Sequence, residues 1–243
     1  MPDARPAIGP AGVSLLVGIL LAAAVAPLCV IEIPAMVDYV NHLARMHLLA
    51  AGMAGEVHPA YEIRWRLVPN LAMDLIVPQV ARWTGVEAAA RVFLAASQVL
   101  LVTGAVALER AVQGRHRAAG LCALLVLFSL PFAWGLMNFM FALGVALWGI
   151  ALWIAVRDRG YGLRMAGHAA LVVALFLSHF FALGLYGLTI GLFEAAMLAR
   201  GRIALRQAAR LAVLMAFPVA VLLAVMSLTG GVIGGRAIDW DFG

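Results

Sequence analysis

Four polar residues recur at helical spacing near position 40 of the chain. Asp38, Asn41, His42 and Arg45 are three or four positions apart, so on a helix they fall on a single stripe. A carboxylate and an imidazole can accept protons, and the planar guanidinium of Arg45 can hold two phosphate oxygens at once. The stripe therefore combines proton-accepting groups with an anion-binding group. Alternatively, Asp38 could serve only as a helix cap, and His42 and Arg45 could form only a solvated face.

A second set of polar residues follows in the same stretch of the chain. Arg64 and Arg66 alternate with apolar residues, which is typical of an extended segment, and either could bind an anion. Asn70 is in position to cap a short helix, and Asp74 lies one turn later on the same side. Asp74 could help His42 to orient a substrate or to bind a divalent cation, or it could form a structural ion pair with an arginine. Because no third ligand lies nearby, the residues do not define a metal site, and we assign none. A divalent cation is the only cofactor that we leave open.

Two more polar residues interrupt apolar runs later in the chain. Asn138 and His179 each lie beside a predicted turn, and both turns lie on the same side of the apolar segments as the stripe. Polar side chains are costly inside a bilayer and tend to face a cavity. We therefore predict that both residues join the stripe in one site, unless they only contact water at two tight turns.

The elements that must position these residues are membrane spans. The chain has 243 residues, of which 65% are hydrophobic and 12% charged, and runs of about 20 apolar residues have the length needed to cross a bilayer. A soluble domain of this size could not bury so much apolar surface. We predict an all-α, polytopic bundle that forms one membrane domain over residues 1–243. Its seven expected spans, two of them short, are residues 11–33, 86–109, 119–134, 136–156, 165–178, 181–198 and 211–228.

The basic residues give this bundle an orientation. All 17 are arginine, and 11 of them fall in short segments on one side of the predicted spans. These 11 are Arg5, Arg110, Arg115, Arg117, Arg157, Arg159, Arg164, Arg200, Arg202, Arg206 and Arg210. By the positive-inside rule that side is cytoplasmic, so we expect the amino terminus in the cytoplasm and the carboxyl terminus outside. Topology and anionic lipid headgroups then explain the net charge of +5, and no nucleic-acid partner is predicted.

This orientation places one long polar segment, residues 34–85, outside the membrane. Within this extracytoplasmic loop we predict an amphipathic helix over 37–54 and a shorter helix over 70–83, both lying in the membrane interface. An extended stretch over 57–68 is expected to connect them. A loop of this length is usually functional. On the opposite side, Glu194 is expected to pair with Arg200 or Arg202.

The arrangement resembles the GT-C superfamily of integral-membrane glycosyltransferases, which use lipid-phosphate sugars. The shared features are one span, a long outer loop with two interfacial helices and an acidic residue near its start, and six further spans. The residues that carry the resemblance are Asp38-Tyr39-Val40-Asn41-His42-Leu43-Ala44-Arg45, after the exit Ile33-Pro34. In that superfamily an Asp or Glu just after the first span acts as catalytic base or helps to hold a metal, and by position this role falls on Asp38. The chain departs from the pattern because no second acid lies beside Asp38 and because it stops after seven spans at residues 239–243, so we expect a fragment or a minimal module of a longer protein.

The resemblance also implies a function. It implies transfer of a sugar from a polyprenyl-phosphate-type donor to an unknown acceptor at the outer face of a bacterial cytoplasmic membrane, with the donor's tail in the lipid bilayer. Asp38 would be the catalytic residue, and nine other residues would bind substrate. These are Asn41, His42, Arg45, Arg64, Arg66, Asn70, Asp74, Asn138 and His179. Two other interpretations stay open: a transporter of a lipid-linked or small polar substrate, and a non-catalytic subunit that helps to assemble a membrane complex.

Overall fold

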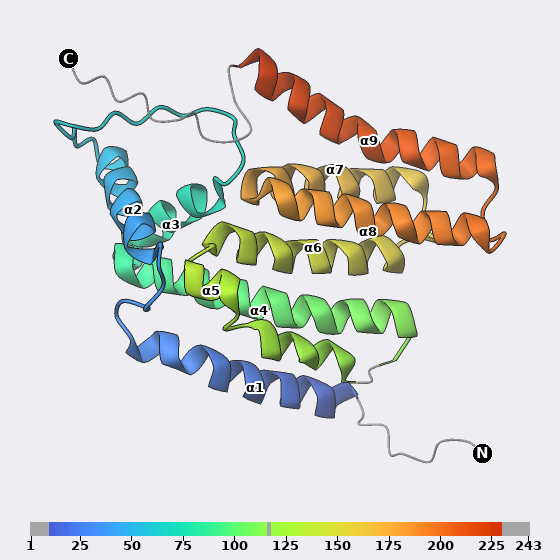
Figure 1. Ribbon diagram of the computed structural model, residues 1–243, viewed down its shortest axis with the longest axis horizontal. Coiled ribbons are helices and arrows are strands. Elements are labelled where there is room, and N and C mark those ends of the chain that lie inside the picture. The colour runs from blue at the N-terminus through green and yellow to red at the C-terminus, as the bar shows by residue number, and fades with distance from the viewer. Residues whose placement is uncertain (1–9, 116–117, 230–243) are drawn as a thin grey trace.

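Long helices lie side by side along most of the chain (Figure 1). The computed structural model describes residues 10–115 and 118–229, and no strand forms within them. Six helices in these two ranges are long and apolar enough to cross a membrane. They are α1 (Pro10–Val30), α4 (Val86–Gln113), α6 (Met137–Ala155), α7 (Tyr161–Ser178), α8 (Phe180–Ala199) and α9 (Leu205–Leu228). The described part of the chain is therefore all-helical, and its six long apolar helices fit a multi-pass membrane protein, as the composition predicts.

The third predicted span, residues 119–134, is not one continuous helix. It forms a 3₁₀ helix, η1 (Ala119–Val126), and a separate α-helix of five residues, α5 (Leu130–Trp134). The break has a local cause, because Pro131 has no N–H to continue a helix from the residues before it and Ser129 adopts an extended backbone. Figure 1 shows that the two pieces nevertheless carry the chain back from the end of α4 to the start of α6, at the opposite end of the bundle.

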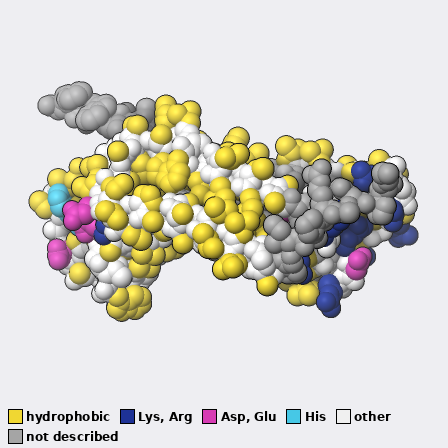
Figure 2. Space-filling model, turned by 90° about the horizontal axis from the view of Figure 1, so that it is seen from below, with side chains coloured by type: hydrophobic (Ala, Val, Ile, Leu, Met, Phe, Trp, Pro, Cys, Tyr) yellow, Lys and Arg dark blue, Asp and Glu magenta, His cyan; other side chains and the backbone are white. Residues whose placement is uncertain are grey.

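Charged side chains gather at the two ends of the bundle. On the face seen in Figure 2, most of the arginine lies at the end where α4 finishes, whereas histidine and most of the acidic side chains lie at the other end. The band between the two ends is dominated by apolar side chains. This is the distribution expected of helices that face lipid in the middle and water at both ends. Arg5 and Arg117 of the predicted cytoplasmic set, and the predicted outer carboxyl terminus, lie outside the described residues.

Helices α4 and α6 pack tightly against each other at two glycines. A Cβ placed on Gly144 of α6 would lie 2.8 Å from the backbone nitrogen of Leu101 in α4. A Cβ placed on Gly104 of α4 would lie 3.0 Å from the carbonyl oxygen of Gly144. Small residues at such contacts allow membrane helices to pack backbone against backbone.

Replacing Gly144 with valine should therefore destabilise the bundle by about 1–3 kcal/mol, because the added side chain has no space between the two helices. The check is the melting temperature of the purified protein in detergent. Gly191→Val is a matched control, because a Cβ at Gly191 of α8 meets no atom within 4 Å. If both variants melted at the same temperature, the α4–α6 contact would not have the tightness described.

Two shorter helices lie at the end of the bundle where α4 and α6 begin. They are α2 (Tyr39–Met53) and α3 (Ala72–Thr84), and α2 crosses that end at a steep angle to the long helices (Figure 1). Fully buried side chains of both helices belong to a core that includes the first turns of α4; they are Tyr39 and Met46 in α2, and Met73 and Val77 in α3. Residues 56–71 between them form neither helix nor strand. This end of the bundle carries most of the predicted site residues.

Candidate functional site

Asp38 immediately precedes α2, and its backbone is tied to the turn before α6. The Asp38 N–H donates to the carbonyl oxygen of Trp134 at 3.2 Å, and the Val37 N–H donates to that of Ala133 at 2.9 Å. Gly135 in the same turn has a φ of +82°, and a Cβ there would lie 3.1 Å from the Asp38 nitrogen. Glycine meets both demands at once, because it tolerates the left-handed conformation and leaves room for the neighbouring backbone. The turn between α5 and α6 thus fixes where the acidic residue stands.

The Asp38 carboxylate is held by side chains of α2 and does not cap that helix. Its Oδ1 accepts a hydrogen bond from Asn41 Nδ2 at 2.7 Å, and its Oδ2 lies 3.3 Å from His42 Nε2. The capping alternative is not realised, because no side-chain hydrogen bond to the helix N–H groups forms at Asp38. The side chain of Asp38 is 45% exposed. A hydroxyl group of a ligand can therefore approach the carboxylate.

Arg45 and Asp74 form an ion pair that joins α2 to α3, in which Arg45 Nη2 donates to Asp74 Oδ2. The arginine side chain is 57% exposed and the aspartate side chain only 4% exposed. Burial raises the pKa of the Asp74 carboxyl, while Arg45 and then His42 offset part of that rise by favouring the charged form. Asp74 thus forms a structural ion pair with an arginine, which was the alternative to a role in substrate or cation binding. This ion pair holds the exposed guanidinium of Arg45 in place.

A cavity of about 390 Å³ opens beside this ion pair, between α2, the first turn of α3 and the preceding irregular segment. Its charged lining residues are Arg45, Arg64, Arg66, Asp74 and Glu62. Arg64 donates to Glu62 at 2.5 Å, and this hydrogen bond lowers the pKa of the Glu62 carboxyl. With three guanidinium groups and two carboxylates, the cavity carries a net charge of about +1. We call it the arginine cavity, and its chemistry suits a phosphate-bearing ligand.

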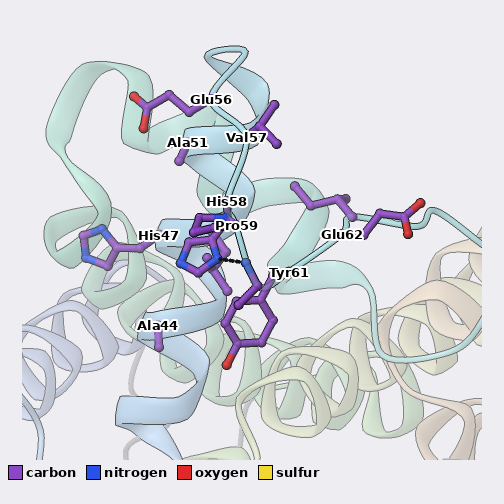
Figure 3. A pocket seen from close by; sticks show the side chains of 13 residues that line it. Ala44, His47, Ala51, Glu56, Val57, His58, Pro59, Tyr61 and Glu62 are labelled. Carbon is purple, nitrogen blue, oxygen red and sulfur yellow. Dashed lines mark hydrogen bonds between the residues drawn. The ribbon is translucent and has the colours of Figure 1, made fainter.

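A second cavity, of about 1020 Å³, lies between α2 and loop residues 56–63 (Figure 3). It shares Leu48, Tyr61, Glu62 and Ile63 with the arginine cavity, but no arginine lines it. The rings of His58 and Tyr61 lie against α2 with centroids 4.9 Å apart, while the Glu62 carboxylate points away from them. His58 and Tyr61 were not among the predicted site residues. Their only sequence signal is that an imidazole and a phenol stand close together in the long polar loop.

Asn138 joins the first turn of α6 to the start of α3. Its Oδ1 accepts a hydrogen bond from the Met73 N–H at 2.8 Å, and its Nδ2 donates to the Asn70 carbonyl at 2.9 Å. Both ends of this buried amide are thereby used on backbone groups. Asn70 is not the predicted cap, because α3 begins after Leu71 and Asn70 adopts a φ of +68°, a left-handed conformation that asparagine tolerates. Asn138 and Asn70 therefore hold the segment that leads into α3.

Replacing Asn138 with leucine should loosen this segment, because two backbone groups lose their partners at about 1–3 kcal/mol for each one left buried. Limited proteolysis should then cut residues 56–71 faster, and the melting temperature should fall. Gln79→Leu is the control, because the exposed Gln79 amide of α3 makes only long contacts, at 3.8 Å to Met53 Sδ and 3.5 Å to Arg82. Protease resistance equal to that of the unmodified protein would show that the Asn138 hydrogen bonds do not secure α3.

His179 lies between α7 and α8 at the same end of the bundle. Its ring packs edge-on against Phe139 with centroids 5.2 Å apart, and its Nδ1 is buried without a hydrogen-bond partner in the described part of the chain. Burial lowers the pKa of the imidazole, which favours its neutral form. Neither His179 nor Asn138 lines the two cavities described above. Arg45 thus belongs both to the stripe and to the lining of the arginine cavity, whereas His179 and Asn138 belong to neither.

No group of three or more His, Cys, Asp or Glu side chains that could hold a metal ion occurs among the residues that the structure describes. Comparison of the chain with family models, curated proteins and solved structures found no match. The function is therefore inferred from the chemistry of the site.

A polar network that the sequence did not predict lies within the bundle, at the end opposite to Asp38. Glu194 of α8 accepts hydrogen bonds from Arg164 of α7 and, at 2.9 Å, from Trp153 Nε1 of α6. Glu194 and Arg164 are each only 7% exposed. The predicted pairing of Glu194 with Arg200 or Arg202 is wrong, because Glu194 faces the interior of the bundle while both of those arginines are exposed in the loop after α8. This network fastens three helices to one another.

Proposed function

We propose that this protein is a membrane glycosyltransferase of the GT-C kind, which moves a sugar from a polyprenyl-phosphate-type donor to an acceptor hydroxyl. The observation that supports this most directly is the half-exposed Asp38 carboxylate, which Asn41 and His42 hold at the start of α2. Because it does not cap the helix, this carboxylate stays available to accept a proton.

In the proposed orientation, α2 and α3 face the outside of a bacterial cytoplasmic membrane and lie in its interface. The arginine-rich end then lies in the cytoplasm, in keeping with the positive-inside rule. The broken segment formed by η1 and α5 makes the third of the seven crossings. The polyprenyl tail lies in the bilayer beside the helices, with its phosphate at the level of the arginine cavity.

The arginine cavity would bind the donor phosphate. Arg45 donates one of its five N–H groups to Asp74, which leaves donors for phosphate oxygens. Asp38 lies seven residues earlier, just before the first residue of the same helix and about 10 Å away along its axis, so the sugar would lie over His42 between phosphate and base. The acceptor oxygen bonds to the anomeric carbon and gives its proton to Asp38, while the bond from that carbon to the phosphate oxygen breaks. The negative charge left on the polyprenyl phosphate faces the guanidinium groups of the cavity.

A transfer assay in proteoliposomes tests this proposal. The probes are polyprenyl-phosphate hexoses and pentoses labelled in the sugar, with a short-chain alkyl glycoside as acceptor. The expected products are a glycosylated acceptor and free polyprenyl phosphate, with no product from nucleotide sugars. If no donor in the panel is consumed, the proposal fails.

A transporter is a second candidate, favoured by polar residues inside the spans. His168 of α7 has its Nδ1 3.0 Å from the Tyr186 hydroxyl of α8 and its Nε2 3.0 Å from the Met215 carbonyl of α9. Intramembrane polar residues often line a substrate path. Uptake of a lipid-linked sugar by vesicles without any covalent product would support this candidate over glycosyl transfer.

A further inference from the structure

A groove of about 790 Å³ opens between α1, α4 and α6, toward the end of the bundle that lies opposite to Asp38. Its walls include Val17 and Leu21 of α1, Val106 of α4, and Trp148 and Leu152 of α6. These side chains line a mainly apolar trough. If the long helices span a membrane, this part of the surface faces lipid. Because water does not enter the hydrocarbon region, such a trough is filled by lipid chains.

One charged residue lines this groove. Arg110 lies in the last turn of α4, is exposed, and forms no ion pair with another residue in the described ranges. The neighbouring Glu109 is engaged elsewhere, since its Oε1 accepts a hydrogen bond from the Ala119 N–H at 2.9 Å. The indole of Trp148 donates to Thr103 Oγ1 at 3.0 Å, so its N–H is already used. Within the described residues, the groove therefore presents one positive charge, Arg110, that forms no salt bridge with a carboxylate.

The length of the groove matches one leaflet of a bilayer. It follows α1 from Leu21 to Val13, which is about 12 Å along the helix axis. Half of the hydrocarbon thickness of a bilayer is about 15 Å. Arg110 lies at the arginine-rich end of α4, so an acyl chain that fills the trough would have its headgroup at the level of this guanidinium.

We propose that the groove binds a phospholipid with a net negative headgroup, whose acyl chain fills the trough and whose phosphate is held by Arg110. A guanidinium can bind phosphate oxygens bidentately, and basic residues at this depth attract anionic lipids. A zwitterionic lipid can also fill the trough, but its own ammonium group compensates the phosphate charge. Arg110 is therefore expected to make the groove prefer an anionic lipid over a zwitterionic one. This site is separate from the proposed glycosyl-transfer site, so either proposal can fail without the other.

Gly18 provides a way to close the groove. It lines the trough, and a Cβ built on it meets no atom within 4 Å. Leucine at this position would extend into the space proposed for the acyl chain without disturbing the packing of α1. Gly191→Leu on α8 is the matched control, because its Cβ also meets open space and it does not line this groove.

Native mass spectrometry of the full-length protein in detergent tests the proposal, with phosphatidylglycerol and phosphatidylcholine of identical acyl chains supplied in equal amounts. The unmodified protein should retain phosphatidylglycerol about fivefold in preference. Gly18→Leu should lose bound lipid of both kinds, and Gly191→Leu should not. Arg110→Gln should keep lipid but lose the preference, while Arg110→Lys and the surface control Arg202→Gln should retain it.

Three results would overturn the proposal. The first is equal retention of the two lipids by the unmodified protein. The second is a preference that survives in Arg110→Gln. The third is an equal loss of preference in Arg110→Gln and Arg202→Gln, which would mean that the arginine-rich end attracts anionic lipid diffusely and has no specific site.

Discussion

Replacing Asp38 with asparagine is expected to lower the rate of sugar transfer by about 10²–10⁴-fold, the contribution typical of a general base. Asparagine has nearly the same shape, and its amide oxygen can still accept the hydrogen bond from Asn41. It cannot take a proton from the acceptor hydroxyl. The Asp38 side chain is not buried and does not cap α2, so the melting temperature should stay close to that of the unmodified protein.

The rate should be measured in proteoliposomes at saturating donor, because a change in donor binding would otherwise be mistaken for a change in chemistry. Glu56→Gln is the matched control, since it removes an exposed carboxylate from the same loop system without touching the stripe. Its rate should remain within a few-fold of the original. Full activity of Asp38→Asn would exclude Asp38 as the base, and an equal loss in both variants would point to a general effect of surface charge.

Replacing Glu194 with alanine is expected to destabilise the protein by about 3–5 kcal/mol, because it leaves the buried Arg164 guanidinium without its counter-charge. Trp153 Nε1 loses its acceptor in the same variant. The guanidinium carbon of Arg164 also lies 3.8 Å from the centroid of the Trp153 ring, so the side chain has little freedom to turn toward water. Removing both charges as Arg164→Leu with Glu194→Leu should recover a large part of the loss.

Thermal unfolding in detergent, followed by near-ultraviolet circular dichroism, measures this effect. Asp158→Asn is the control, because Asp158 is 97% exposed and lies 3.9 Å from Arg157, and exposed pairs contribute about 0–1 kcal/mol. Equal melting temperatures for Glu194→Ala and Asp158→Asn would show that the buried pair does not hold α6, α7 and α8 together.

The long helices could be predicted from the sequence because a bilayer imposes a minimum length of apolar chain, and that length is visible in one dimension. The stripe on α2 could be predicted for a similar reason, since the positions of Asp38, His42 and Arg45 follow the helical period. The break in the segment over residues 119–134 was harder to predict from the sequence. The segment's composition is as apolar as that of a span, and only Pro131 indicates the interruption.

The pairings between helices could not be predicted, because they depend on how the helices pack. Arg45 and Asp74 are 29 positions apart, and Arg164 and Glu194 are 30 apart. In the second pair, the nearer arginines after α8 were the more obvious partners in the sequence. Asn138 was predicted to face a cavity because it is polar, but its amide groups bind the backbone of the segment before α3. A buried polar residue can satisfy its hydrogen bonds either way, and the sequence does not distinguish the two.

The most direct test of the proposed site is whether residue 38 is reached from outside the cell. Cysteine is placed at position 38 in a background in which the two native cysteines, Cys29 and Cys122, are replaced by alanine. Intact spheroplasts are treated with a membrane-impermeant maleimide, and a second variant with cysteine at Arg157 reports on the opposite end of the bundle. Labelling of position 38 in intact cells, with position 157 labelled only after permeabilisation, is the predicted result. Labelling of position 38 only after permeabilisation would contradict an outer-face glycosyltransferase that uses Asp38.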